Sequence, residues 1–291
     1  MDHHLAIALS LTASVSFAFF SIVARKALGA TTPYVGAVIG LAIGIPILGG
    51  LSLVYSDWSG LTYEAALWFF VGGIFAPGFS RLLLFMGYRT IGVGRTMPLV
   101  TITPFLATLV AIAWLGEHPN LAVWVAIFFV TGGCLFLTVK PEGDSDWRRI
   151  HMIYPFLHAF MMAFVNTSRR YGLLLYGDFI IGALIANAVS LPTLLLLAPA
   201  LPKAERFRMD MRGLVWFTVA GLINMVAYIA FFAAFQYGEV FIVMPLSYTA
   251  PLFSLLLARV WLREEEKLTW QKWAGSALLF IGTAIIALAS A

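Results

Sequence analysis

Long apolar runs separated by short polar segments extend along the whole chain. The polar segments hold most of the charged residues. A helix rises about 1.5 Å per residue, so a run of about 20 residues crosses the roughly 30 Å hydrocarbon layer of a membrane. The pattern predicts ten membrane-spanning helices, at residues 5–24, 33–55, 65–86, 96–115, 121–139, 152–168, 179–197, 213–235, 240–262 and 270–289.

The composition agrees with a chain that lies mostly in the membrane. Of 291 residues, 61% are hydrophobic and 11% are charged, against about 25% charged in a soluble domain. Ten spans of about 20 residues leave short loops, which excludes most cytosolic enzymes. The sequence holds no phosphate-binding Gly-Lys-Ser/Thr loop and no hydrolase motif, so it predicts neither an ATP-driven pump nor an enzyme, and no cofactor. The single cysteine, Cys134, excludes an intrachain disulfide and a cysteine metal cluster, and no metal site is predicted.

Several residues recur at one offset of 147 positions, which composition alone does not explain. The matched pairs are Pro98 and Pro245, Pro104 and Pro251, Trp114 and Trp261, and Glu117 and Glu264. Five spans per half is an odd number, so the second half enters the membrane from the opposite face. The sequence therefore predicts an all-α polytopic membrane protein of two inverted five-helix repeats, typical of alternating-access transporters. Residues 1–139 form the first repeat, 140–149 a polar connecting loop and 150–291 the second repeat.

Basic residues gather on one predicted face of the membrane. The loops after the odd-numbered spans, with Lys272, hold fourteen of the eighteen Lys and Arg residues. The opposite face holds Arg169 and Arg170, which are interpreted as ending the first helix of the second repeat. By the positive-inside rule, we expect cytoplasmic basic loops and both termini on the outer, periplasmic side of a bacterial inner (plasma) membrane. The net charge of +4 then reports orientation, not nucleic-acid binding.

Arg81 lies within the third predicted span, eight residues before Arg89 and hence about 12 Å of helix from that end. A charge at this depth costs at least a few kcal/mol unless it is paired or hydrated. Its guanidinium can hold a substrate carboxylate through two hydrogen bonds. Alternatively it binds carbonyls freed by a helix break near Pro77, or extends to the interface. None of the fourteen Asp and Glu residues lies in the middle of a span, which disfavours proton exchange for organic cations.

Other polar residues also fall inside predicted spans. Asn224 and Tyr228 are one helical turn apart and share a face, and the repeat aligns Ser80 with Tyr228. Amides are costly in lipid, so this face is expected to line a cavity or to bridge packed helices. His158, about eight residues into its span, is a candidate for proton or substrate binding, or for an interhelical bridge.

The fourth and ninth spans each hold two prolines six residues apart. A proline lacks the N–H that a helix needs, so each span is expected to be interrupted there. Thr101 and Tyr248 occupy equivalent positions between the prolines. These helices are candidate gates, or else carry static kinks. The candidate gating residues are Pro98, Pro104, Pro245 and Pro251.

The Pro-Leu-x-x-x-x-Pro helix, the Trp-Leu-x-Glu motifs ending at Glu117 and Glu264, and the glycine-bearing last helix of each half resemble the drug/metabolite transporter superfamily, EamA type. The resemblance covers essentially the whole chain. It implies export or exchange of small metabolites, often amino acids, as in the YddG-like exporters. It also implies a cavity built from the first, third and fourth helices of each half. The substrate-binding residues it indicates are Ser14, Phe17, Ser80, Arg81, Thr101, His158, Asn224, Tyr228 and Tyr248.

The sequence thus predicts a secondary transporter of amino-acid-like metabolites that alternates around a midplane cavity. Arg81 is expected to bind the carboxylate, and Asn224 with Tyr228 the polar remainder. The expected partners are the substrate and the lipid bilayer, with no nucleic acid, and the expected functional unit is the monomer. Alternatives are an organic-cation or drug exporter and a membrane scaffold or sensor without transport. Many ten-span members of the family place both termini in the cytoplasm, unlike the orientation predicted here.

Overall fold

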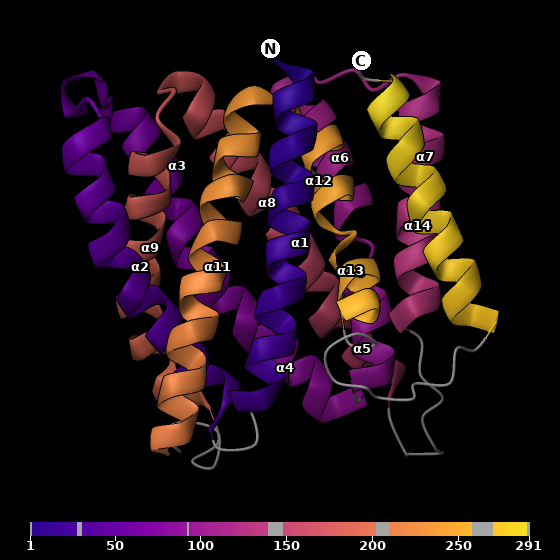
Figure 1. The fold of residues 1–291 in the computed structure, drawn as a ribbon, viewed down its shortest axis with the longest axis horizontal. Helices are drawn as coiled ribbons and strands as arrows, with labels where there is room; N and C mark the ends of the chain where they lie inside the picture. Colours follow the sequence, from indigo (N-terminus) through magenta and orange to yellow (C-terminus); the bar gives the residue numbers. More distant parts are fainter. Residues whose placement is uncertain are drawn as a thin grey trace.

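Helices run back and forth between the two ends of a bundle (Figure 1). In the residues that the structure describes, they make ten passes. The structure is a computed structural model, and it describes residues 2–27, 31–91, 93–138, 148–201, 210–257 and 270–289. Every regular element in these residues is a helix. The predicted fold class, an all-α polytopic protein, is confirmed.

The first five passes comprise seven α-helices, because the third and fourth passes are broken. They are α1 (His3–Ala27), α2 (Pro33–Tyr55), α3 (Tyr63–Gly73), α4 (Ser80–Ile91), α5 (Val93–Val100), α6 (Thr103–Leu115) and α7 (Leu121–Thr138). A π-helical turn, η2 (Ile74–Phe79), joins α3 to α4, and a short 3-10 helix, η1 (Trp58–Gly60), precedes α3. The Thr32 hydroxyl accepts the Val35 N–H at 3.3 Å and caps α2, with Pro33 at its first position.

The second set repeats this order. It consists of α8 (Ile153–Leu175), α9 (Phe179–Leu196), α11 (Met211–Tyr237), α12 (Val240–Ser247), α13 (Ala250–Leu257) and α14 (Trp270–Ala289). Two 3-10 helices, η3 (Arg149–Met152) and η4 (Ala198–Ala200), lie in its connections. Asp178 accepts the N–H groups of Ile180 and Ile181 and caps α9.

Length and hydropathy alone identify seven membrane spans among the described residues. Two shorter apolar helices, Tyr63–Ala76 and Leu121–Leu137, belong to the third and fifth passes. The passes follow the predicted spans closely, with one notable difference. The helix α8 continues to Leu175, where the sequence predicted an end at 168. The polar residues from Asn166 to Arg170 are buried inside the bundle, so they do not end the helix.

The two passes that hold paired prolines are both interrupted midway. The break lies at Thr101 and Ile102 in one pass, and at Tyr248 and Thr249 in the other. Threonine hydroxyls satisfy carbonyls that the breaks leave free, with Thr101 donating to the Pro98 carbonyl at 2.7 Å. The predicted interruption therefore occurs at equivalent places in both halves.

The two halves run through the bundle in opposite directions. His3 at the start of α1 lies 3.7 Å from Glu239 (His3 Nδ1 to Glu239 Oε2). Glu239 in turn lines a pocket with Arg170 and Leu174, which lie near the end of α8. The first helix of one half thus begins where the first helix of the other half ends, and both chain termini lie at this same end (Figure 1). This is the inverted arrangement that the sequence predicted. We call this end the terminal end of the bundle.

Close helix packing depends on glycine where α7 lies along α14 (Figure 1). A Cβ atom on Gly133 would lie 2.8 Å from the Gly275 carbonyl oxygen, and one on Gly275 would lie 2.9 Å from the Gly133 carbonyl oxygen. A Cβ on Gly282 would approach the Ala126 carbonyl oxygen to 2.9 Å. Two helix backbones touch here, as small residues allow in membrane proteins.

Candidate functional site

A cavity of about 560 Å³ lies between the two halves. Its described walls come from α1, α2, η2 and α4 of the first half and from α8, α9 and α11 of the second. It extends from Arg169 and Phe231 to Ala24 and Pro33, close to the end of α1 and the start of α2. The volume falls within the range of small-molecule sites, about 300–1,000 Å³.

Five of the predicted binding residues line this cavity: Phe17, Ser80, His158, Asn224 and Tyr228. Ser80 and Tyr228, which the repeat aligns with each other, both line this cavity. The His158 ring nitrogen Nδ1 lies 2.7 Å from the Ser80 backbone oxygen, which is a hydrogen bond between the two halves. This contact favours the interhelical role of His158 that the sequence left open, while its position also exposes it to the cavity.

Arg81 is the second residue of α4, directly after Ser80 in the cavity wall. Its side chain lies outside the described residues. The break before α4 is real, since Ala76 has extended backbone angles (φ −139°, ψ 129°). The Ser190 hydroxyl of α9 lies 2.9 Å from the Gly73 carbonyl oxygen and 3.2 Å from that of Ala76, and so provides a donor at this break.

Three other predicted residues, Ser14, Thr101 and Tyr248, do not line the cavity. Ser14 is buried and its hydroxyl lies 2.9 Å from that of Thr249, at the break of the ninth pass. The Thr101 hydroxyl donates to the Pro98 carbonyl oxygen three residues earlier. The Tyr248 ring packs on two apolar clusters of the core, and its carbonyl oxygen accepts a bond from Cys134 Sγ at 3.1 Å. These residues lie beside the helix breaks.

A second arginine, Arg169, lines the cavity and was not among the predicted site residues. It belongs to the part of α8 beyond the predicted helix end, and only 4% of it is exposed. Its Nη1 donates to Asn166 Oδ1 at 3.0 Å. Its Cζ lies 5.0 Å from the ring centre of Phe232 and 5.8 Å from that of Tyr228, within cation–π range. The sequence signal that could have indicated it is the run of polar residues Asn166 to Ser168, directly before Arg169 and at the end of an otherwise apolar stretch.

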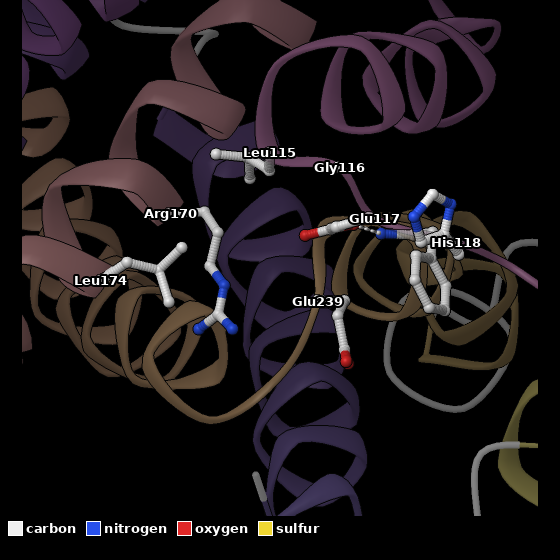
Figure 2. A pocket seen from close by; sticks show the side chains of 8 residues that line it. Leu115, Gly116, Glu117, His118, Arg170, Leu174 and Glu239 are labelled. Atoms are coloured by element: carbon white, nitrogen blue, oxygen red, sulfur yellow. Dashed lines mark hydrogen bonds between the residues drawn. The ribbon is translucent and has the colours of Figure 1, made fainter.

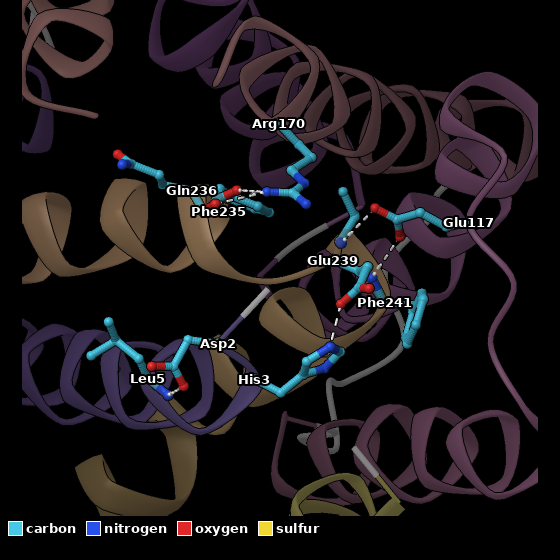
Figure 3. Close-up of polar contacts among 10 residues, drawn as sticks. Asp2, His3, Leu5, Glu117, Arg170, Phe235, Gln236, Glu239 and Phe241 are labelled. Carbon is cyan, nitrogen blue, oxygen red and sulfur yellow. Dashed lines mark hydrogen bonds and ion pairs between the residues drawn. The ribbon is translucent and has the colours of Figure 1, made fainter. Parts of the chain in front are cut away.

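A smaller pocket of about 340 Å³ lies at the terminal end, and Figure 2 shows Arg170, Glu117 and Glu239 around it. Arg170 Nη1 donates to the carbonyl oxygens of Phe235 and Gln236 at the end of α11. The Glu117 carboxylate accepts the N–H groups of Val240 and Phe241, at 3.0 and 3.3 Å, at the start of α12 (Figure 3).

These bonds hold both sides of the short connection between α11 and α12. Arg170 satisfies carbonyls at the C-terminal end of one helix, and Glu117 caps the N-terminal end of the next. Glu117 is the glutamate of the Trp-Leu-x-Glu motif, so this motif joins the first half to the second. Burial raises the pKa of Glu117 to about 7, against the lowering effects of the two backbone bonds and of Arg170. The Glu239 carboxylate adds to the rise.

Fold and cavity together define a multi-pass helical membrane protein with a small-molecule-sized cavity between two inverted halves. A family model described as the EamA-like transporter family matches residues 4–139 and again residues 149–288. The chain belongs to this family, and it is a membrane transporter of the drug/metabolite type.

A solved structure has the same fold. It is titled only "Crystal structure of protein", and it aligns with a TM-score of 0.76 over 98% of this chain and 97% of its own length. The two sequences are 18% identical, so the similarity concerns the fold alone. No curated protein matches this chain in sequence.

Proposed function

We propose that the protein exports or exchanges small metabolites of the amino-acid type across a bacterial inner membrane by alternating access. The observation that carries the proposal is the cavity between the halves, to which each half contributes apolar and polar side chains at equivalent positions, such as Ser80 and Tyr228. Inverted-repeat transporters hold their substrate at such an interface.

Alternating access requires that one end be open while the other is closed. The cavity extends toward the α1–α2 connection, away from the terminal end. Beyond Phe231 the space is filled by a core cluster that includes Phe232, Phe235 and Met244. We propose that this cluster, together with the Glu117 and Arg170 contacts, forms the closed gate. In this scheme the interrupted passes at Pro98, Pro104, Pro245 and Pro251 bend when the gate opens.

Transport in proteoliposomes tests the proposal. Vesicles that contain the purified protein and unlabelled amino acid should accumulate radiolabelled amino acid from outside by exchange, and protein-free vesicles should not. The Asn224→Ala variant should reduce the exchange rate, because its amide lines the cavity. If no member of a panel of amino acids exchanges, the proposed substrate class is wrong.

The proposed orientation places both termini in the periplasm and the cavity opening toward the cytoplasm, where an exported metabolite would be loaded. Alkaline phosphatase fused after residue 291 should therefore be active, since this enzyme matures only in the periplasm. The same reporter fused after residue 148, at the far end of the basic loop, should be inactive. The reverse pattern would invert the orientation and would make the open state an outward-facing one.

A further inference from the structure

Among the described residues that line the cavity, Arg169 is a buried cation whose hydrogen bonds are incomplete. Arg169 is 4% exposed, and its Nε is buried without a hydrogen-bond partner among the described residues. Its side-chain hydrogen-bond partner among the described residues, Asn166, is neutral. A guanidinium offers five N–H donors and is fully charged, so an amide and two ring faces leave much of its capacity unused.

The described residues of the cavity wall provide no counter-ion for Arg169. None of the described residues that line the cavity is Asp or Glu. The ion pair between His3 and Glu239 belongs to the terminal end and not to the cavity. Removing a charge from water costs several kcal/mol, and a buried cation is normally stabilised by an anion. The missing anion can be supplied by what enters the cavity.

The rest of the cavity wall is mainly apolar. Aromatic side chains reach it from α1 and α11, and Leu84 and Met162 add aliphatic and thioether surface. The aromatic residues are Phe17, Phe20, Phe217, Tyr228 and Phe231. Such walls favour a ligand whose body is apolar. Because their dielectric constant is low, they also strengthen the attraction between a single charge and a ligand of opposite sign.

From these observations we infer that Arg169 is the anion-binding residue of the cavity, and that the ligand is an organic carboxylate with an apolar body. The carboxylate bonds to the guanidinium, in the bidentate geometry that Arg and carboxylate prefer, and the apolar body lies against the aromatic wall. An ammonium group is accommodated but is not the recognised feature, because the described wall offers it amide oxygens and no carboxylate. This inference rests on the proposed function only in taking the cavity as the substrate site.

Three compounds with the same aromatic body test whether the carboxylate or the ammonium group is recognised: 3-phenylpropionate, phenylalanine and phenethylamine. They carry an anion, a zwitterion and a cation. Each is added to the full-length protein in detergent, and the thermal unfolding midpoint is measured, since a ligand that binds the folded state raises it. We expect 3-phenylpropionate and phenylalanine to raise the midpoint and phenethylamine to leave it unchanged. A rise with phenethylamine alone would overturn the inference.

Variants identify the residue responsible. Arg169→Gln should weaken binding of 3-phenylpropionate about tenfold to a hundredfold, as expected for loss of a charge-assisted pair. Arg169→Lys should retain part of the affinity, because it keeps the charge but loses the planar fork. Arg149→Gln removes the same charge from an exposed position in η3 and should bind like the native protein. Unchanged affinity in Arg169→Gln would contradict the assignment.

Asn166→Asp keeps Arg169 and tests the inference even if Arg169→Gln fails to fold. The new carboxylate would stand where Asn166 Oδ1 already accepts from Arg169 at 3.0 Å, so it competes with the ligand for the guanidinium. We expect a folded protein that no longer binds 3-phenylpropionate. Native-like binding in this variant would overturn the inference. Binding without any transport by the native protein would instead refute the proposed function and leave the inference intact.

Discussion

At pH 5 the Glu117→Ala variant should have a free energy of unfolding about 2–6 kcal/mol lower than that of the native protein, because two buried N–H groups would lose their acceptor, at about 1–3 kcal/mol each. Val240 is fully buried and Phe241 is 9% exposed, so water does not readily replace the carboxyl group of Glu117. Glu117→Gln keeps one amide oxygen for this cap and should lose only about 1 kcal/mol at that pH. Thermal unfolding in detergent measures both. Equal midpoints for the alanine variant and the native protein would show that the cap contributes nothing.

Titration of Glu117 should also make the stability of the folded protein depend on pH. The Glu117 pKa is raised to about 7 in the folded protein, above the ordinary value of 4.5. The folded state therefore binds the proton more tightly than the unfolded state. The stabilisation is complete below about pH 4.5 and is lost as the pH rises through 7. The free energy of unfolding of the native protein should fall by up to about 3 kcal/mol over this range, at about 1.36 kcal/mol per pKa unit. That of Glu117→Gln should fall much less. Parallel pH profiles would contradict the assignment.

Gly133→Leu should prevent recovery of folded, monodisperse protein. Its side chain would be forced against the backbone of α14, where even a Cβ atom lies 2.8 Å from the Gly275 oxygen and 2.9 Å from the Leu279 nitrogen. Overpacking of this kind costs about 3 kcal/mol, and more where backbone must move. Gly132→Leu is the matched control, since a Cβ at Gly132 meets no atom within 4 Å. Size-exclusion profiles that are the same for the two variants would show that the α7–α14 contact is not needed.

Much of the fold follows from local features of the sequence. The ten apolar runs and the paired prolines have direct physical consequences, since each proline removes a helical N–H. Asn224 and Tyr228 were predicted to line a cavity or to bridge packed helices, because an amide is costly in lipid. Both residues line the cavity. Periodicity and hydropathy are sufficient for these features.

Other features depend on contacts between distant parts of the chain. Glu117 and the N–H groups it caps are more than 120 positions apart, at 123 and 124 residues, so no local pattern indicates the cap. The pair Arg169 and Arg170 was interpreted as the end of a helix, because the repeat matches it with Arg25 and Lys26 at the end of the first span. In the structure Arg170 bonds to carbonyls of α11 and Arg169 faces the cavity. Their environment comes from packing of α8 against α11.

Cysteine labelling at Gly40 tests whether the cavity between the halves carries the substrate. This residue lines the cavity, and a Cβ there meets no atom within 4 Å, so Gly40→Cys should fold and transport. The native Cys134 is buried, which keeps background reaction low. Gly132→Cys, in equally open space on α7 and outside the described cavity wall, is the control.

A water-soluble thiol reagent should stop exchange by Gly40→Cys in proteoliposomes, and saturating substrate should slow the modification. The Gly132→Cys variant should keep its exchange activity after the same treatment. If Gly40→Cys is modified yet transports at its original rate, or if substrate never protects it, the substrate does not pass through this cavity.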